Sequence, residues 1–169
     1  LTPNTPMAVF ITHQGYLKRI SLDTFERQNR ATRGKAGMKT KEDDDIQHFF
    51  TAMMHDKVLF FSSKGICYSL NVYDFPEGGR QAKGLPIVNV LPIEQGEKIT
   101  AVVPVSNFSH DLNLIMLTQK GYIKRIELDN FASIRRSGII AISLEEGDRL
   151  NWVKLANPND EIIIGTSCG

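Results

Sequence analysis

The sequence has 169 residues and a formal net charge of +1, with 41% hydrophobic and 23% charged residues, which is ordinary for a globular chain. No apolar run approaches the ~18 residues that span a bilayer, and no secretory signal is visible. Its two cysteines, Cys67 and Cys168, fit neither a disulfide framework nor a metal-ligand spacing. These features favour a reducing, cytoplasmic-type compartment over a membrane or secreted class.

One pattern recurs four times along the chain: an apolar run, then Thr or Ser, two further residues and Gly. The copies are 8–15 (AVFITHQG), 58–65 (VLFFSSKG), 114–121 (LIMLTQKG) and 162–169 (IIIGTSCG), and their glycines are spaced by 50, 56 and 48 residues. Three copies continue with a Phe ten residues after the Gly, followed by a second Gly: Phe25, Phe75, Phe131, Gly34, Gly84 and Gly138. Such self-similarity indicates a repeat architecture.

Each copy predicts a β-hairpin. A short apolar run such as residues 58–61 is typical of a buried strand. The glycine that follows permits a tight turn with positive φ. The next run, residues 122–126 in the third copy, is expected to be a strand near the rim whose Lys and Arg reach solvent. A further strand is expected over 46–52, after the acidic residues 42–45, which are either a solvated turn or a weak cation site.

Units of about 50 residues with four short strands predict an all-β, propeller-like array in which each unit packs against its neighbours. The approximate units are 7–56, 57–110 and 111–158, with a fourth that begins at 159–169, and residues 1–6 are expected to be a connector. Because the sequence stops inside the repeated motif, we expect it to be a piece of a longer chain.

Several common enzyme motifs are absent from the sequence: it contains no H-E-x-x-H, no C-x-x-C and no complete phosphate-binding loop. The four histidines, His13, His48, His55 and His110, show no ligand spacing. We therefore predict no catalytic residue, no metal site and no cofactor.

Cations are concentrated in the first unit. Residues 15–41 carry eight cations against two carboxylates, a net charge of +6. The cations are Lys18, Arg19, Arg27, Arg30, Arg33, Lys35, Lys39 and Lys41; the second unit adds Lys64, Arg80 and Lys83, and the third adds Lys120, Lys124, Arg125, Arg135 and Arg136. Stacked repeats would place them along one rim, where they suit the sugar-phosphate backbone of duplex DNA. The alternative is a solvated charged face.

These residues resemble the C-terminal DNA-wrapping domain of DNA gyrase A, part of a type IIA topoisomerase. The G-Y-x-K-R hairpins at 15–19 and 121–125, the FSSKG hairpin at 61–65 and the stretch 82–105 carry the resemblance, which extends over nearly the whole chain. It implies about three blades of a six-bladed β-pinwheel whose neighbouring blades exchange strands. It further implies that duplex DNA bends around the basic rim in support of ATP-dependent negative supercoiling.

The family's hallmark box, Q-R/K-R-G-G-R/K-G, is expected in a loop at residues 28–34. Gln28, Arg30, Arg33 and Gly34 match it, whereas Asn29, Ala31 and Thr32 depart. Lys35 and Gly37 lie just downstream and partly compensate.

The resemblance also implies what the chain works with. The catalytic tyrosine lies in an N-terminal domain outside this sequence, and ATP and magnesium belong only to a holoenzyme that contains two copies each of gyrase A and gyrase B. The expected location is the bacterial nucleoid or a plastid. The alternatives are the corresponding domain of topoisomerase IV, which relaxes or decatenates DNA, and a non-enzymatic propeller-type scaffold that binds proteins.

Overall fold

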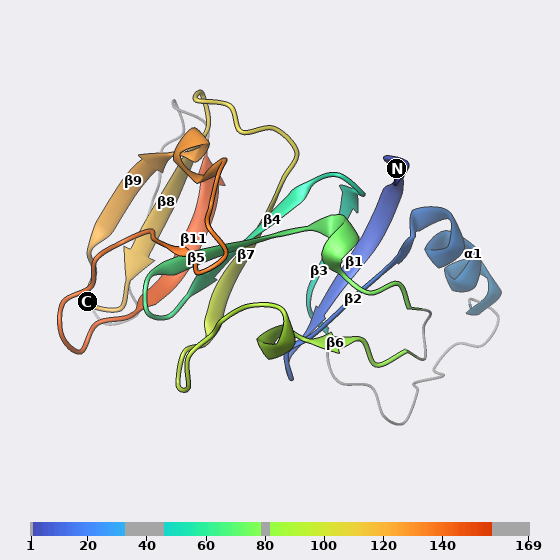
Figure 1. The fold of residues 1–169 in the computed structure, drawn as a ribbon, viewed down its shortest axis with the longest axis horizontal. Coiled ribbons are helices and arrows are strands. Elements are labelled where there is room, and N and C mark those ends of the chain that lie inside the picture. The colour runs from blue at the N-terminus through green and yellow to red at the C-terminus, as the bar shows by residue number, and fades with distance from the viewer. Residues whose placement is uncertain (1, 33–45, 79–81, 157–169) are drawn as a thin grey trace.

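Three antiparallel sheets lie side by side in the computed structural model of the chain, which describes residues 2–32, 46–78 and 82–156 (Figure 1). Their orders are β3-β1-β2-β6 in the first sheet, β10-β5-β4-β7 in the second and β11-β8-β9 in the third. The strands are β1 (Pro6–Thr12), β2 (Tyr16–Ser21), β3 (Ile46–Met53), β4 (Lys57–Ser62), β5 (Ile66–Asn71), β6 (Leu85–Pro86), β7 (Ile99–Val105), β8 (Asn113–Thr118), β9 (Ile123–Glu127), β10 (Ile139–Ile140) and β11 (Leu150–Ala156). The predicted all-β class is confirmed.

The repeated Ser/Thr-x-x-Gly pattern forms the turn of each described hairpin, β1–β2, β4–β5 and β8–β9. Gly15, Gly65 and Gly121 have φ values of 87°, 81° and 95°, which favour glycine. The hydroxyl accepts a hydrogen bond from the backbone N–H four residues later, at 3.0 Å for Thr12 and Thr118 and 3.3 Å for Ser62. The repeat is therefore a hairpin signature in which the hydroxyl closes the turn and the glycine reverses the chain.

The first two sheets each contain a short strand from the next part of the chain. Residues 85–86 pair with residues 16–17, and residues 139–140 pair with residues 66–67. We call 82–86 and 135–140, which carry β6 and β10, the exchanged segments. The second glycine of each repeat introduces them: Gly84 and Gly138 have φ values of 94° and 85°. In the third sheet, no described strand pairs with the outer edge of β9, where Tyr122 and Ile123 are exposed.

The core lies in two seams, and β4 contributes to both. Val58 and Phe60 pack with residues of the first sheet, whereas Leu59 and Phe61 pack with residues of the third. Alternate residues of a strand point to opposite faces, so a continuously apolar strand is buried on both sides. The second sheet is thus held between the other two.

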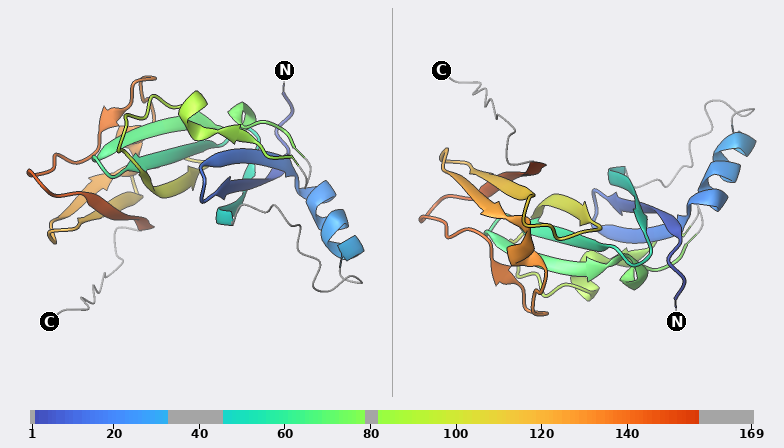
Figure 2. Two further views of the ribbon diagram at one scale, coloured as in Figure 1. Left: turned by 90° about the horizontal axis from the view of Figure 1, so that it is seen from below. Right: turned by 90° about the horizontal axis from the view of Figure 1, so that it is seen from above.

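A helix, α1 (Leu22–Thr32), follows β2 and extends from one end of the array (Figure 2). We expected a loop for residues 28–34, and for residues 28–32 this was wrong. The Ser21 hydroxyl accepts a hydrogen bond from Thr24 N–H at 3.2 Å, an N-terminal cap. Neither Gly nor Pro interrupts residues 22–32, and Leu22 and Phe25 pack against β1 and β2.

Short 3-10 turns connect several strands: η1 (Val72–Asp74), η2 (Ile87–Asn89) and η3 (Leu128–Phe131). The repeated Phe residues follow the second strand of each hairpin, and Phe75 and Phe131 are fully buried in the two seams. No helix in the described ranges is long and apolar enough to cross a membrane.

Candidate nucleic-acid interface

The structure describes part of the predicted DNA-binding set. Six of those residues, all in 33–45 and 79–81, lie outside the described ranges: Arg33, Gly34, Lys35, Lys39, Lys41 and Arg80. The acidic residues 42–45 also lie outside them. The described members fall into four places: α1, the outer edge of the first sheet, the outer edge of the second sheet, and β9.

On α1, Gln28 and Arg30 lie in the second half of the helix. Arg30 is exposed and makes no hydrogen bond or ion pair with a described residue, whereas Arg27 pairs with Asp23 one turn earlier at 2.6 Å. Both members of that pair are exposed, so it contributes little to stability. The helix presents the matching Gln and Arg of the box on an element that projects beyond the first sheet.

At the outer edge of the first sheet, Lys18 and Lys83 lie close to one exchanged segment. Lys18 Nζ donates to the Ala82 carbonyl at 3.1 Å, and Lys83 Nζ lies 4.8 Å from the centre of the Tyr16 ring. Arg19 Nε donates to the Phe75 carbonyl at 2.8 Å. Lys18 and Arg19 are both half-buried, and Arg19 forms a parallel β-bridge with Glu77 in the segment after β5.

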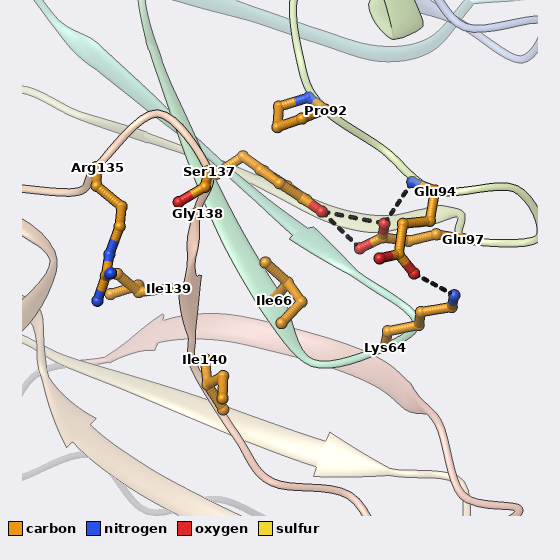
Figure 3. A pocket seen from close by; sticks show the side chains of 11 residues that line it. Lys64, Ile66, Pro92, Glu94, Glu97, Arg135, Ser137, Gly138, Ile139 and Ile140 are labelled. Atoms are coloured by element: carbon orange, nitrogen blue, oxygen red, sulfur yellow. Dashed lines mark hydrogen bonds and ion pairs between the residues drawn. The ribbon is translucent and has the colours of Figure 1, made fainter.

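At the outer edge of the second sheet, a cavity of about 680 Å³ lies between the exchanged segment and the turn after residue 91. Lys64 and Arg135 lie on opposite sides of it (Figure 3). Lys64 forms an exposed ion pair with Glu94 at 2.9 Å, and this hydrogen bond raises the pKa of Lys64 and lowers that of Glu94.

The wall of this cavity contains a buried polar pair. The Tyr68 hydroxyl lies 3.0 and 2.9 Å from the two carboxylate oxygens of Glu97, and Glu97 also accepts a hydrogen bond from Glu94 N–H (Figure 3). Both side chains are buried, with 3% and 8% exposure. Burial first, and then the bond to Glu97, raise the pKa of Tyr68 above its ordinary value.

We expect Tyr68→Phe to destabilise the chain by about 1–3 kcal/mol at neutral pH, because it leaves the buried Glu97 carboxylate without its hydroxyl donor. The pKa of Tyr68 is raised on folding, so its contribution is complete below pH ~10 and is lost as the pH rises further. Urea unfolding at pH 7 and pH 11 should therefore show a smaller difference between wild type and variant at pH 11. A difference that does not change with pH would contradict this assignment.

On the third sheet, Lys124 and Arg125 lie on exposed β9. Lys124 Nζ donates to the Ala141 carbonyl at 3.0 Å, and Arg125 also has a partner. Arg135 and Arg136 are exposed and form no hydrogen bond or ion pair within the described part of the chain. The two arginines lie at the start of the second exchanged segment, and Lys83 lies near the start of the first.

Lys98 and Arg149 are exposed cations that the sequence patterns did not single out. They end the related stretches 94–98 (EQGEK) and 145–149 (EEGDR) and immediately precede β7 and β11. Both are exposed, and neither side chain forms a hydrogen bond or ion pair with a described residue. The pattern E-x-G-E/D-K/R was visible in the sequence, but its loose spacing after the second glycine concealed it.

No group of three His, Cys, Asp or Glu within the described ranges is placed to hold a metal ion. Cys67 is buried, and burial raises its pKa, so it lacks the thiolate character of a nucleophile. What the arrangement offers chemically is a set of exposed cations along the edges of successive sheets.

The fold and this surface define a class: a propeller-like array of strand-exchanging sheets with cations at the outer edges. A family model described as "DNA gyrase C-terminal domain, beta-propeller" matches residues 7–52, 56–106 and 112–157. The chain belongs to this family, so the predicted resemblance to the C-terminal domain of DNA gyrase A is confirmed.

Among its relatives, the chain is 53% identical over its whole length to the DNA gyrase A protein of Synechocystis sp. and covers 20% of that protein. It is 46% identical over its whole length to the DNA gyrase A protein of Halalkalibacterium halodurans, of which it also covers 20%. Over 99% of its length it is 46% identical to the chloroplastic/mitochondrial DNA gyrase A protein of Nicotiana benthamiana, of which it covers 18%. The chain thus spans about a fifth of the length of these relatives.

Solved structures agree on the fold. The C-terminal domain of a DNA topoisomerase IV matches 92% of the chain and 47% of that structure, with a TM-score of 0.77 and 25% identity. A DNA gyrase A C-terminal domain matches 90% of the chain and 48% of that structure, with a TM-score of 0.61 and 20% identity. The β-pinwheel prediction is therefore confirmed, with strand exchange visible in the first two sheets.

Proposed function

We propose that the chain is a DNA-binding and DNA-wrapping module of a DNA gyrase A protein, and that it bends duplex DNA around its basic edge. One observation carries the proposal: exposed cations recur where each exchanged segment begins, Lys83 at the first sheet and Arg135 and Arg136 at the second. Neighbouring sheets thus offer cations at corresponding points, which suits a regularly spaced phosphate backbone. Membership of the gyrase family supports this interpretation.

In the whole protein, this module would support ATP-dependent negative supercoiling. Its partners would be duplex DNA, gyrase B and a second copy of gyrase A, and ATP and magnesium would act in the other parts of that holoenzyme. The setting would be a bacterial nucleoid or an organelle, since the relatives include bacterial and chloroplastic/mitochondrial proteins. Asn29, Ala31 and Thr32 depart from the box. These departures concern the wrapping of DNA rather than DNA binding itself.

The second candidate is the corresponding domain of topoisomerase IV, which is favoured by the TM-score of 0.77. The sequence identities of 53% and 46% to gyrase A proteins favour gyrase. A protein-binding scaffold, the third candidate, would use its cations only for solubility.

Binding to a duplex of tens of base pairs is expected to weaken as salt rises, with a log–log slope of about −0.9 for each phosphate contact. The triple variant Lys83→Gln, Arg135→Gln, Arg136→Gln should bind more weakly and reduce the slope by up to about 2.7. Fluorescence anisotropy with the full chain that carries these residues measures both quantities.

The matched control is Lys154→Gln, which removes an exposed cation on β11 away from the exchanged segments; it should leave the slope unchanged. Binding that is undetectable or independent of salt would refute the proposal. Wrapping itself is tested by closing relaxed plasmid with a ligase in the presence of the full chain: a change in linking number is expected for gyrase, and none would favour the scaffold.

A further inference from the structure

A second cavity, of about 410 Å³, lies at the seam between the second and third sheets. We call it the seam pocket. It is lined by the β4–β5 turn (Ser63, Lys64) and by residues at the starts of β7 and β11: Gly96, Lys98, Thr100, Asp148, Arg149 and Asn151. Three cations and one carboxylate therefore face this space, and none of its lining residues is aromatic.

Hydrogen bonds to the main chain and hydroxyl of Ser63 hold the two strand starts together. Ser63 N–H donates to the Lys98 carbonyl at 2.7 Å, Lys98 N–H donates to the Ser63 hydroxyl at 3.1 Å, and Leu150 N–H donates to the Ser63 carbonyl at 3.0 Å. One residue of the second sheet thus fixes the backbone next to both Lys98 and Arg149. The spacing of Lys98 and Arg149 is a property of the fold.

The carboxylates beside these two cations accept hydrogen bonds from other groups, although Asp148 Oδ2 is buried and has no hydrogen-bond partner among the described residues. Glu97 accepts hydrogen bonds from Tyr68 and from Glu94 N–H. Asp148 Oδ1 accepts the N–H groups of Lys120 and Arg149, at 2.9 and 2.8 Å. Burial opposes ionisation of Asp148, but these bonds and the Thr118 hydroxyl outweigh it and lower its pKa. Neither carboxylate forms an ion pair with Lys98 or Arg149.

The seam pocket also continues the cationic edge described above. Lys64 lines both this pocket and the cavity that contains Arg135. The two spaces therefore adjoin at Lys64, whose own charge is paired with Glu94. Arg135 on one side, and Lys98 and Arg149 on the other, have no partner among the described residues.

We propose that the seam pocket binds a phosphodiester group of the DNA backbone, held by Lys98 and Arg149 and by the polar side chains of Ser63 and Asn151. This rests on the proposed function, and it adds a contact point away from the exchanged segments. Arginine offers paired N–H donors to phosphate oxygens, lysine a point charge, and hydroxyl and amide groups complete such sites. With no base-reading element in the pocket, the contact is independent of DNA sequence.

The test compares Lys98→Gln, Arg149→Gln and the double variant with wild type in the full chain, using a duplex of tens of base pairs. Each substitution should weaken binding and reduce the salt slope by about 0.9, and the double variant by about 1.8. Lys154→Gln removes the same charge as Lys98→Gln from an exposed position outside the pocket, and should leave the slope unchanged. Thermal unfolding of each variant controls for folding.

A second measurement avoids substitution altogether. Acetylation of lysine amines, followed by mass spectrometry, should show that duplex DNA protects Lys98 and leaves Lys154 reactive. If the duplex binds with the wild-type slope in the double variant and Lys98 stays unprotected, the seam pocket is overturned while the proposed function stands. If no duplex binds at any salt concentration, both the seam-pocket proposal and the proposed function are refuted. Protection of Lys98 by an acidic peptide but not by DNA would replace the phosphodiester with a protein partner.

Discussion

Gly65→Ala is expected to destabilise the chain by about 2–5 kcal/mol, whereas Gly121→Ala, at the same turn one repeat later, should cost about 1–2 kcal/mol. Both glycines have a positive φ, 81° and 95°, so both substitutions place a side chain in the left-handed region. At Gly65, a Cβ would also overlap the Ile142 carbonyl oxygen, whereas at Gly121 no described atom lies within 4 Å. The difference between the two costs measures the close approach alone.

The close approach exists because residues 141–142, which directly follow the second exchanged segment, lie against the β4–β5 turn. The Gly65 carbonyl accepts hydrogen bonds from the N–H groups of Ala141 and Ile142, at 2.8 and 3.2 Å. An added methyl group therefore has to displace the backbone that completes the second sheet. Urea unfolding of the two variants and wild type provides the measurement. Equal losses of stability would show that residues 141–142 do not press on this turn.

The hairpins could be predicted because a short-range signal specifies them. The turn is specified by four residues, a hydroxyl residue, two further residues and Gly. The apolar run before them predicts a buried strand. The exchanged strands could not be read from the residues in this way. Leu85 and Pro86 pair with a strand about 70 residues earlier, and only the resemblance to a known family implied such an exchange.

The helix was missed because its sequence signals were weak beside the charge run. Ser21 and Thr24 make a cap, but residues 22–32 contain only Leu22 and Phe25 as strongly apolar positions. The run of cations indicated the box, and that motif is expected in a loop. Packing of Phe25 against the rings of Phe10 and Phe49, at 5.6 and 5.3 Å, supplies tertiary support that no local pattern could reveal.

The distribution of charge in the sequence indicated a basic surface. It did not show which cations already have a partner within the described structure. Lys18, Arg19 and Lys124 were selected for their charge, yet each donates to a main-chain carbonyl of a distant segment. Lys98 and Arg149 were passed over, yet no described residue pairs with their side chains. The distinction depends on where carbonyl groups of other segments fall, which is a property of the tertiary structure.

Phe60→Ala and Phe61→Ala are each expected to cost about 3–5 kcal/mol. Both rings are fully buried, but they lie on opposite faces of β4. Phe60 stacks near Phe75, with ring centres 6.2 Å apart, and Phe61 meets Phe131 edge-on at 5.8 Å. Phe49, which is 47% exposed, is the matched control, since its truncation leaves no enclosed cavity. Phe49→Ala should therefore cost clearly less than either.

These neighbouring residues also test whether the three sheets unfold together. Each seam joins two sheets, and β4 contributes alternate residues to both, so loss of either core removes the support of the same strand. We therefore expect a single unfolding transition that both variants shift to lower temperature by a similar amount. Two resolved transitions in calorimetry, with Phe60→Ala shifting only one, would show instead that the seams are independent and that β4 does not couple them.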